Sequence, residues 1–476
     1  MTKKEAYASF SNSMLKFTNF TNDKLKFIQK YTKKSPYRVC DITAGVLFMW
    51  KDIYNLSFAV FNGTLILKCN FKNKTTAFFL PIGRDFDGAL SKIEEYALKT
   101  KTPLNFMCVE DEYLPLLTKR YGELDSEFNR DFSDYLYDYQ QLKTLVGKKF
   151  SGQRNHINSF NKSYPSAKFK KLKSRDISKV KEFLKEYKKE HANGGVIERA
   201  EFKNTLQLVD NLNLASYECG YMEIDKKLCS FTIGEYAGDT FVIHVEKALK
   251  NYKGIYPATF NAFLKASEKE GINFINREDD SGDIGLRTSK MQYQPIRLVN
   301  KNFVAVKKPM QIEKRPKIVG NKVVISKIKK SSKQDYFDLY TDKALNKYWG
   351  YDYKKDIKTP TPDAFFNMQE NDFKVKDNTC LGIYSKSGRF MGEVVLHNFT
   401  YDGEVEVGVR LFKKYHGKGY AKEAVSLIAN YAKTTLNKRP VAKCFLQNEA
   451  SLNCLKSAGF VVKNKDKKYY YLNYEK

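Results

Sequence analysis

Residues 405–432 read VEVGVRLFKKYHGKGYAKEAVSLIANYA, and two periodicities meet within them. The first residues alternate valine with Glu, Gly or Arg, which is the period of a half-buried strand. From Ala421 onward the apolar residues recur every three or four positions, which is the period of an amphipathic helix. Between the two lies KKYHGKGYA, where Gly417 and Gly419 can take backbone angles that other residues resist. The stretch therefore predicts a strand, a glycine-bearing turn and the start of a helix.

A turn of this kind is suited to a phosphate group. The first N–H groups of a helix have no partner inside the helix, and the helix dipole adds a partial positive charge at the same end. Two glycines between a strand and a helix are weak evidence by themselves, because most such turns only connect elements. Neighbouring motifs are needed to distinguish a phosphate site from a connection.

Those motifs are present. The turn resembles the pyrophosphate-binding motif R/Q-x-x-G-x-G/A of the GNAT-type N-acetyltransferases, with Lys414 where Arg or Gln is usual. The string HGKGYAKEA resembles the branch that acetylates the amino termini of ribosomal proteins. Residues 448–451 (NEAS) and 456–460 (KSAGF) resemble the second motif of that branch. The resemblance implies a GNAT domain that transfers acetyl from acetyl-CoA to a primary amine on a small molecule, a protein N-terminus or a lysine.

Composition limits the class of protein. A chain of 476 residues is too long for one ordinary core, so two or three domains are expected. No apolar run approaches the length of a membrane span, and the first residues lack the apolar core of a signal peptide. The eight cysteines occur singly, which is typical of reduced, mostly buried thiols rather than a disulfide framework or a zinc site. We therefore expect a cytoplasmic protein with no metal and no transmembrane segment.

The net charge of +29 is the most unusual feature of the composition. Such a charge attracts polyanions, including RNA, anionic lipid headgroups and phosphate-rich cofactors. A solvated surface made largely of lysine explains the same number equally well. The charge alone does not identify the partner.

A second resemblance covers most of the first two-thirds of the chain. Residues 131–164 carry aromatic residues and then basic ones, a mixture that can contact nucleic acid or form an interface helix. DYLYDYQQL and GKKFSGQRNHINSF from this stretch are similar to the C-terminal domain of phosphatidylglycerol lysyltransferase. The similarity continues through FVIHVEKAL (241–249), GIYPATFNAFL (254–264), INFINREDDSG (272–282) and GLRTSKMQYQP (285–295). That family has paired GNAT-like lobes and is related to the aminoacyltransferases that take amino acids from tRNA.

The two parts of the chain share one order of elements. A strand with Glu246, a loop with Gly254, a helix and a strand to Asn276 repeat the order around Glu406. The middle loop, LKNYKGIY, lacks the second glycine, which argues against coenzyme A binding there. Further upstream, Asn62-Gly63 lies between two alternating runs and predicts a hairpin.

The resemblances imply an α/β chain of tandem GNAT-like acyltransferase units, each a twisted mixed sheet flanked by helices. We expect a lysyltransferase-like domain at residues 1–306, with lobes at about 1–165 and 166–306. Two prolines and a charge run predict a linker at residues 307–322. The GNAT domain is expected at residues 323–476.

Acetyl transfer requires a held cofactor, a polarised thioester carbonyl, a deprotonated amine and a protonated or stabilised thiolate. In GNAT proteins a main-chain N–H near Val409 or Arg410, freed by a bulge, polarises the carbonyl. Glu406 is the expected base, through water, with Glu404 as its rival, although either can simply face solvent. Ser451 is the hydroxyl nearest to the tyrosine acid of relatives, which is replaced here by leucine. The expected catalytic residues are Glu406, Ser451 and Glu404, and the expected cofactor-binding residues are Val409, Arg410, Lys414, Tyr415, His416, Gly417, Lys418, Gly419, Tyr420 and Asn448.

Substrate-binding residues are expected in both parts. Trp349 and Tyr351 follow the first helices of the GNAT domain, which border the acceptor cleft in that family, although both can simply pack. In the first two-thirds, charged residues follow an apolar strand, where α/β folds place their sites. A salt-bridge network between lobes is the alternative. The expected substrate-binding residues are Trp349, Tyr351, Arg154, Glu246, Arg277, Glu278 and Arg287.

Together the resemblances imply an acyltransferase that is an enzyme, with acetyl-CoA as its cofactor and tRNA as a further partner of the N-terminal domain. The N-terminal domain would then transfer an aminoacyl group of the lysyl type. The alternative is that this domain does not catalyse and binds RNA or a protein for the acetyltransferase.

Overall fold

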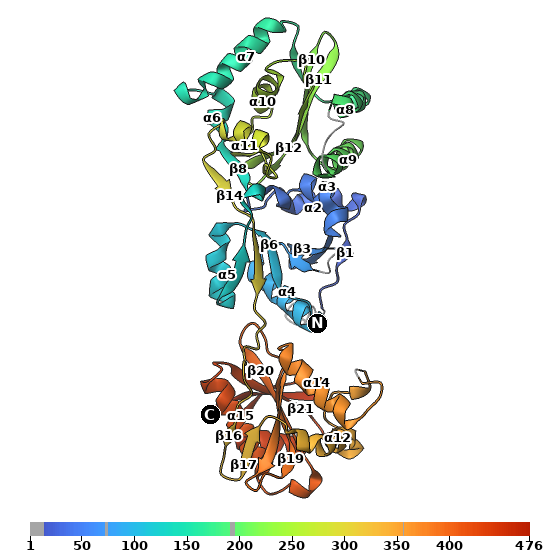
Figure 1. Cartoon of the computed structure of the whole chain (residues 1–476), viewed down its shortest axis with the longest axis vertical. Helices are drawn as coiled ribbons and strands as arrows, with labels where there is room; N and C mark the ends of the chain where they lie inside the picture. Colours follow the sequence, from blue (N-terminus) through green and yellow to red (C-terminus); the bar gives the residue numbers. More distant parts are fainter. Residues whose placement is uncertain (1–13, 72–74, 191–195, 356) are drawn as a thin grey trace. The chain divides into compact units, whose positions relative to one another are not determined.

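The computed structural model describes residues 14–71, 75–190, 196–355 and 357–476. The chain forms two compact units, unit 1 at Met1–Lys307 and unit 2 at Lys308–Lys476 (Figure 1). No helix in the described ranges is long and apolar enough to cross a bilayer. All eight cysteines are free thiols and five of them are buried, as the composition predicted.

Unit 1 contains two mixed sheets. The first has the strand order β1-β2-β3-β4-β6-β15-β7, and β5 pairs with β3. Asn62 and Gly63 take φ angles of 45° and 71°, so the predicted hairpin joins β2 to β3. The strands of this sheet are β1 (Thr18–Asn19), β2 (Ser57–Phe61), β3 (Thr64–Asn70), β4 (Thr76–Phe78), β5 (Ile82–Gly83), β6 (Asn105–Val109), β7 (Leu124–Glu127) and β15 (Asn302–Val306). Its helices are α2 (Leu25–Thr32), α3 (Ala44–Tyr54), α4 (Phe86–Thr100) and α5 (Leu114–Tyr121).

The second sheet of unit 1 has the order β14-β8-β13-β12-β11-β10-β9. Its strands are β8 (Asp134–Asp138), β9 (Lys168–Lys171), β10 (Glu218–Ile224), β11 (Lys227–Ala237), β12 (Thr240–Ala248), β13 (Phe274–Asn276) and β14 (Arg297–Val299). Its helices are α6 (Tyr139–Thr144), α7 (Ser151–Ser163), α8 (Ile177–Glu190), α9 (Val196–Asp210), α10 (Ile255–Ala266) and α11 (Ile284–Met291).

The second lobe of unit 1 is inserted into the first. After β7 the chain leaves the first lobe, and β8 pairs between β13 and β14 in the second sheet. After β14 it returns, and β15 pairs between β6 and β7 in the first sheet. The second sheet is therefore built from one continuous segment, β8 to β14, and the first sheet is completed by β15 after that insertion.

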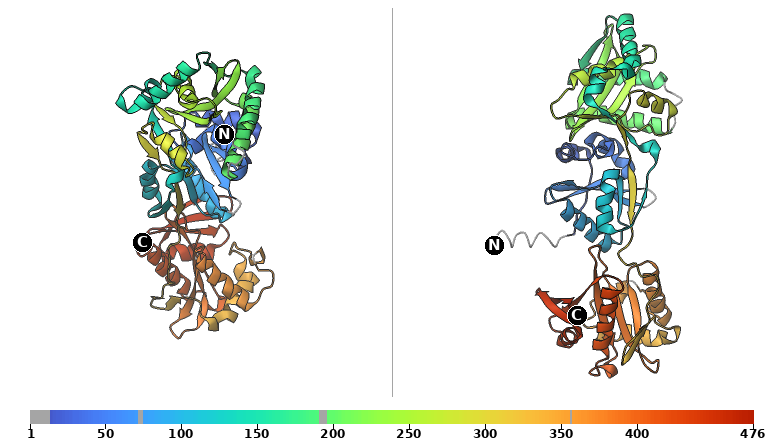
Figure 2. Two further views of the ribbon diagram at one scale, coloured as in Figure 1. Left: turned by 45° about the horizontal axis from the view of Figure 1, so that its top comes forward. Right: turned by 90° about the vertical axis from the view of Figure 1, so that its left-hand side faces the viewer.

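Unit 2 has one sheet, with the order β16-β17-β18-β19-β20-β21-β23-β22. Figure 1 shows α15 on one side of this sheet and α12 and α14 on the other, and Figure 2 shows the sheet from two further directions. The strands are β16 (Ile318–Val319), β17 (Val323–Ser326), β18 (Thr379–Ser385), β19 (Phe390–His397), β20 (Glu404–Leu411), β21 (Arg439–Phe445), β22 (Phe460–Lys465) and β23 (Tyr469–Tyr474). The helices are α12 (Lys333–Thr341), α13 (Lys343–Asn346), α14 (Pro362–Lys374), α15 (Tyr420–Thr434) and α16 (Glu449–Ala458).

One supersecondary pattern occurs in all three sheets. A strand, a crossover helix and a parallel neighbouring strand are seen as β4-α4-β6, β12-α10-β13 and β20-α15-β21. On one side of each parallel pair lie antiparallel strands that precede it. The predicted fold, tandem GNAT-like units with mixed sheets flanked by helices, is confirmed.

Two expected boundaries differ from the structure. The lobe boundary was expected near residue 165, but β8 already belongs to the second sheet, and α7 packs against α10 of that lobe. The expected linker at 307–322 is not a free connection, because Met310 and Ile312 are buried in the core of unit 2 and β16 joins its sheet. The prolines and charged residues of this segment are typical of a linker, although two apolar residues stand at alternate positions within it.

Candidate active sites

The glycine turn of unit 2 has the geometry that the sequence predicted. Gly417 and Gly419 have φ angles of 72° and 81°, and Gly419 is the N-cap of α15, without a side-chain cap hydrogen bond. A Cβ added at Gly417 would meet no heavy atom within 4 Å. His416 shares a hydrogen bond of 2.9 Å with the main-chain oxygen of Leu411, which ties its ring to the end of β20. The first turn of α15 is therefore open to a ligand, between the exposed Lys414 and Lys418.

The corresponding turns of unit 1 are closed. Gly254 has φ 84° at the N-cap of α10, but a Cβ there would lie 2.8 Å from the main-chain oxygen of His156 in α7. Helix α4 is capped by Asp85, whose carboxylate accepts from the N–H of Gly88 and would repel a phosphate. Of the three crossover helices in the described ranges, only α15 begins at an open glycine turn. This agrees with the missing second glycine in the middle loop.

Strands β20 and β21 diverge next to this turn. They pair in parallel only from Glu404 to Glu406, and their later residues are not paired with each other. On its other side β20 pairs with β19 from Glu406 to Leu411 without a register shift. The prediction of a bulge near Val409 and Arg410 is therefore wrong. Main-chain groups on the β21 side of residues 407–411 become available because the strands diverge.

Glu406 lies where β20 and β21 separate. Its carboxylate accepts a hydrogen bond of 2.8 Å from the Asn398 side chain, and Nε2 of His397 is 4.0 Å away. Its side chain is 21% exposed, so water can reach it. The rival, Glu404, lies 3.6 Å from Arg439 at the more exposed end of the strand. The geometry favours Glu406 over Glu404 as a base.

The side chain of Arg410 has a structural position. Its Nε donates to the buried carboxylate of Glu393 at 2.8 Å, and its guanidinium lies 3.8 Å from the ring centre of Tyr340 and 4.3 Å from that of Trp349. Trp349 in turn covers Gly408, where an added Cβ would lie 3.3 Å from the indole. Arg410 thus holds Trp349 against β20. Tyr351 is in a different place, with its hydroxyl 3.6 Å from the sulfur of Met368.

Helix α16 has the predicted caps. The Asn448 side chain accepts from the N–H of Ser451, and Gly459 ends the helix with φ 113°. The thiol of Cys444 next to this helix donates to the main-chain oxygens of Phe445 and Asn448, each at 3.5 Å, and burial raises its pKa.

Sequence reasoning missed the aromatic residues on the sheet face that carries Glu406. A hydrogen bond to Asp466, more than burial or the charge of Glu406, raises the pKa of Tyr471 to about 12. Lys443, Phe445 and Tyr469 lie on the same face. Their alternation in VAKCF and KKYYYLNY was a signal that could have revealed them.

In unit 1, Glu246 and Arg277 form an ion pair between the diverging ends of β12 and β13. Nη2 of Arg277 lies 2.9 Å from Glu246, and the guanidinium is 4.3 Å from the ring centre of Phe260. Within the described part of the chain, Nη1 of Arg277 and the hydroxyl of Thr232 are buried without a protein partner. A small pocket here is lined by Ser230, Phe231, Thr232, Glu246, Lys247, Ala248, Tyr256, Thr259 and Phe260.

The other expected residues of unit 1 are not at this pocket. Arg154 donates to the main-chain oxygens of Leu145 and Gly147, which closes the turn before α7. Arg287 binds the carboxylates of Asp280 and Asp131 at 2.8 and 2.6 Å and so ties two loops together. These arginines stabilise the fold.

Glu278 belongs to a third group, at the junction of the lobes. It shares His244 with Glu235, at 2.8 and 3.1 Å from the two ring nitrogens. Burial opposes the charge of this imidazole, but the two carboxylates outweigh burial and raise its pKa to about 9. Glu235 also accepts from the main-chain N–H of Gly45 in α3, so this network connects the lobes.

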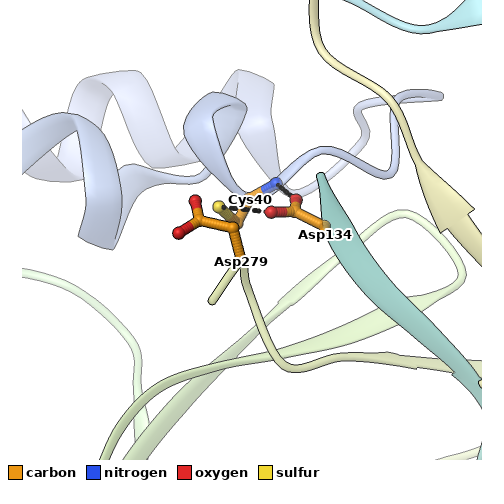
Figure 3. Close-up of side chains that lie close together, drawn as sticks. All are labelled: Cys40, Asp134 and Asp279. Atoms are coloured by element: carbon orange, nitrogen blue, oxygen red, sulfur yellow. Dashed lines mark hydrogen bonds between the residues drawn. The ribbon is translucent and has the colours of Figure 1, made fainter. Parts of the chain in front are cut away.

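Lys301 stands at the point where the chain returns from the second sheet to the first. Figure 3 shows Cys40, Asp134 and Asp279, whose ligand atoms lie within 4.8 Å of one another. The ammonium of Lys301 is 2.7 Å from Asp134 and 3.2 Å from Asp279, and it also binds Asp41 at 2.6 Å. Burial disfavours its charge, yet the surrounding carboxylates hold the pKa of Lys301 above its usual value. The cation of this cluster is a lysine side chain.

Comparisons with known proteins identify both parts of the chain. A family model described as "Phosphatidylglycerol lysyltransferase, C-terminal" matches residues 32–305. A second, described as "Acetyltransferase (GNAT) domain", matches residues 322–461. The uncharacterized protein MYCGA3080 of Mycoplasmoides gallisepticum is 24% identical over 177 residues, which are 37% of this chain and 56% of that protein. The chain thus matches only about half the length of that relative.

Two solved structures are also similar. A conserved protein of unknown function from Bacteroides thetaiotaomicron is 29% identical, with 62% of this chain and 100% of that chain covered and a TM-score of 0.58. L-PGS from Bacillus licheniformis is 15% identical, with 59% of this chain and 91% of that chain covered and a TM-score of 0.43.

The first family model covers more than half of the chain, and it coincides with the two lobes of unit 1. The second lies within unit 2. Both describe domains that transfer acyl groups. The chain therefore belongs to the phosphatidylglycerol lysyltransferase C-terminal family and carries a GNAT acetyltransferase domain after it.

Proposed function

We propose that unit 2 transfers acetyl from acetyl-CoA to a primary amine. The observation that carries this proposal is the open glycine turn at Gly417, at the N-terminus of α15 and beside the divergence of β20 and β21. Main-chain N–H groups at a helix start bind a pyrophosphate without a charged partner from the protein. The diverging strands provide the place for the arm that follows the pyrophosphate.

The residues of unit 2 fit the remaining steps. Bound acetyl-CoA supplies a thioester whose carbonyl carbon accepts the amine. Glu406 receives the proton of the amine through water, at the edge where β20 leaves β21. Of residues 407–411, those whose main-chain N–H groups do not face β19 have them available to the carbonyl oxygen. Tyr471, on the same sheet face, is a proton donor that the sequence did not suggest.

Gly417→Asp is expected to abolish the stabilisation of unit 2 by acetyl-CoA. The new carboxylate would enter the open space above the turn and repel the pyrophosphate. At a ligand concentration of about 100 times Kd, the parent gains roughly 2.7 kcal/mol, which thermal melting detects. A rise in Tm with acetyl-CoA in this variant equal to that of the parent would mean that the turn is not the cofactor site.

Gly388→Asp is the matched control. Gly388 has φ 84° in the β18–β19 hairpin, and a Cβ there has only the Lys329 ammonium within 4 Å, at 3.8 Å. The two substitutions therefore introduce similar backbone strain and the same charge. Only the change at Gly417 should remove the response to acetyl-CoA.

For unit 1 we propose aminoacyl transfer from tRNA. Helix α7 covers Gly254, so a donor held by a pyrophosphate at α10 does not fit. The pocket beside it contains a carboxylate, Glu246, and the hydroxyls of Ser230, Thr232 and Thr259, which suit the ammonium of an aminoacyl group. Membership of the lysyltransferase family supports this donor. The alternative, a module that only binds RNA or a protein, predicts equal binding of aminoacylated and uncharged tRNA.

The full chain is expected to bind aminoacylated tRNA more tightly than uncharged tRNA, and Glu246→Gln should remove that preference. The substitution keeps the shape of the side chain but weakens its attraction for an ammonium. Binding to both tRNA forms can be measured by fluorescence anisotropy over a salt series. Glu223→Gln, which changes a carboxylate on β10 that pairs with Lys170 of β9, is the control. Equal binding of the two tRNA forms by the parent would favour the non-catalytic module.

A further inference from the structure

One face of the unit 2 sheet carries aromatic and basic side chains beside Glu406. In the register, Glu406 pairs with Val441, Lys443 with Tyr471, and Phe445 with Tyr469. Side chains alternate along a strand, so Glu406, Lys443, Phe445, Tyr469 and Tyr471 all point to the same face. The opposite face is the apolar core under α15 and α16, formed by residues such as Ala442 and Leu472.

The aromatic rings contact one another and the neighbouring lysines. The rings of Phe445 and Tyr469 are 4.6 Å apart, and Tyr348 lies 5.6 Å from Phe445. The ammonium of Lys443 is 4.0 Å from the ring centre of Tyr469, and that of Lys468 is 5.2 Å from it. We call these residues, with Tyr471, the aromatic platform: Tyr348, Lys443, Phe445, Lys468, Tyr469 and Tyr471.

The platform is accessible and lies next to the candidate acceptor site. Tyr471 is 36% exposed, and both lysines are exposed. Tyr348 immediately precedes Trp349, which covers Gly408 on β20. An amine that reaches Glu406 along the open part of the sheet therefore passes beside these rings.

The charges around the platform select among possible occupants. Among the residues that the structure describes, Asp466 is the carboxylate hydrogen-bonded to the platform, and it accepts from the main-chain N–H groups of Lys468 and Tyr469 and from the Tyr471 hydroxyl. Its charge is thus directed into the β22–β23 turn, whose other exposed residues are Lys465, Lys467 and Lys468. The surface offers flat rings and ammonium groups. Bases stack on such rings, and phosphates pair with such ammonium groups.

We propose that the aromatic platform binds single-stranded RNA and that the acceptor amine of unit 2 is carried by that RNA. An acidic peptide would satisfy the lysines but would leave the aromatic rings, whose planes are tilted to one another, without flat partners. The inference rests on the proposed acetyltransferase function. In the reaction, the RNA-borne amine forms a bond to the acetyl carbon and the carbon–sulfur bond of acetyl-CoA breaks. The amine proton leaves through Glu406, and free coenzyme A is released as the thiol.

Photo-crosslinking of the full chain tests the binding step. The RNA is a single-stranded oligonucleotide of about 12 nucleotides, within the range of single-strand binding sites, with 4-thiouridine as the crosslinker. Unit 1 is basic as well, so mass spectrometry must assign each crosslink to a peptide. We expect crosslinks in the peptides that contain Phe445 and Tyr469. Their dependence on RNA concentration gives the apparent affinity at the platform.

Variants separate stacking from general attraction. Tyr469→Ala and Phe445→Ala should each weaken RNA binding at the platform by about 5- to 150-fold, the usual effect of losing one stacked base. Tyr469→Phe retains the ring and should bind like the parent. Lys443→Gln should make the logarithmic salt dependence shallower by about 0.7. Lys433→Gln removes the same charge from α15, on the opposite side of the sheet, and should change nothing at the platform.

The acceptor is tested separately with acetyl-labelled acetyl-CoA. A 3′-aminoacylated RNA should accept label at least about tenfold faster than the same aminoacyl ester without RNA, and Tyr469→Ala should abolish that difference. Crosslinks absent from the platform overturn this inference, while stabilisation by acetyl-CoA would still support the proposed function. Competition by an acidic peptide that is itself acetylated would also overturn it and assign the platform to a peptide acceptor. Absence of an acetyl-CoA response with crosslinks retained would overturn the proposed function, and with it the assignment of the acceptor, while RNA binding at the platform would stand.

Discussion

Glu406→Gln is expected to lower the rate of amine acetylation by roughly 10²–10⁴-fold while acetyl-CoA still binds, as for the loss of a general base. Glutamine can keep the contact with Asn398 but does not take a proton. We propose that acetyl-CoA binds at the turn at Gly417, which Glu406→Gln leaves unchanged. Steady-state rates and acetyl-CoA-dependent melting of the same variant measure the two effects independently.

The loss in Glu406→Gln should shrink as pH rises, because an amine that is already deprotonated needs no base. Glu404→Gln is the matched control, since Glu404 lies two residues away on the same face and is closer to Arg439 than to the divergence of the strands. We expect it to retain most of the activity. If the two variants were equally active near neutral pH, Glu406 would have no role as the base.

Lys301→Met is expected to destabilise unit 1 by at least about 3–5 kcal/mol, because it leaves Asp41, Asp134 and Asp279 without their buried cation. The lysine side chain is only 7% exposed, so water cannot replace its charge. A domain has a total stability of about 5–15 kcal/mol, so this loss is a large part of it. Hydrogen exchange with mass spectrometry should locate the increased unfolding in unit 1.

Lys307→Met provides the comparison. Lys307 pairs with Glu123 at 2.7 Å, but both side chains are exposed, and such pairs contribute about 1 kcal/mol or less. Lys301→Met combined with Asp134→Asn should recover part of the stability, because one buried negative charge is removed. Unfolding of Lys301→Met at the same denaturant concentration as the parent would show that the cluster does not hold the lobes together.

Local features of this protein were predictable from its sequence. The strand, turn and helix around Gly417, the hairpin at Asn62-Gly63 and the caps at Asn448 and Gly459 all appear in the structure. Each depends on residues within a few positions of one another. Backbone angles, periodicity and capping act at that range, so the sequence carries the necessary information in a short window.

The repeated order of elements was also predictable, and with it the tandem units and the absence of an open glycine turn in the middle unit. The family membership followed from motifs spread over most of the chain. What the sequence predicted for Arg154 and for the bulge near Val409 differed from the structure. The sequence does not show whether an arginine binds a ligand or a main-chain carbonyl, because the fold decides which of the two lies beside it.

Only the tertiary structure revealed the insertion of one lobe of unit 1 into the other, the closure of Gly254 by α7 and the cluster around Lys301. The return of the chain to the first sheet depends on pairing between β15 and β6, which lie almost 200 positions apart, as the contact between Asn302 and Val109 illustrates. The aromatic platform likewise joins β21 and β23 through register rather than sequence. The sequence determined which short segments form strands, turns and helices. Long-range pairing decided which side chains share a surface. The main-chain groups of a strand can form hydrogen bonds with many other strands, and only the packing of the core selects the partner strand.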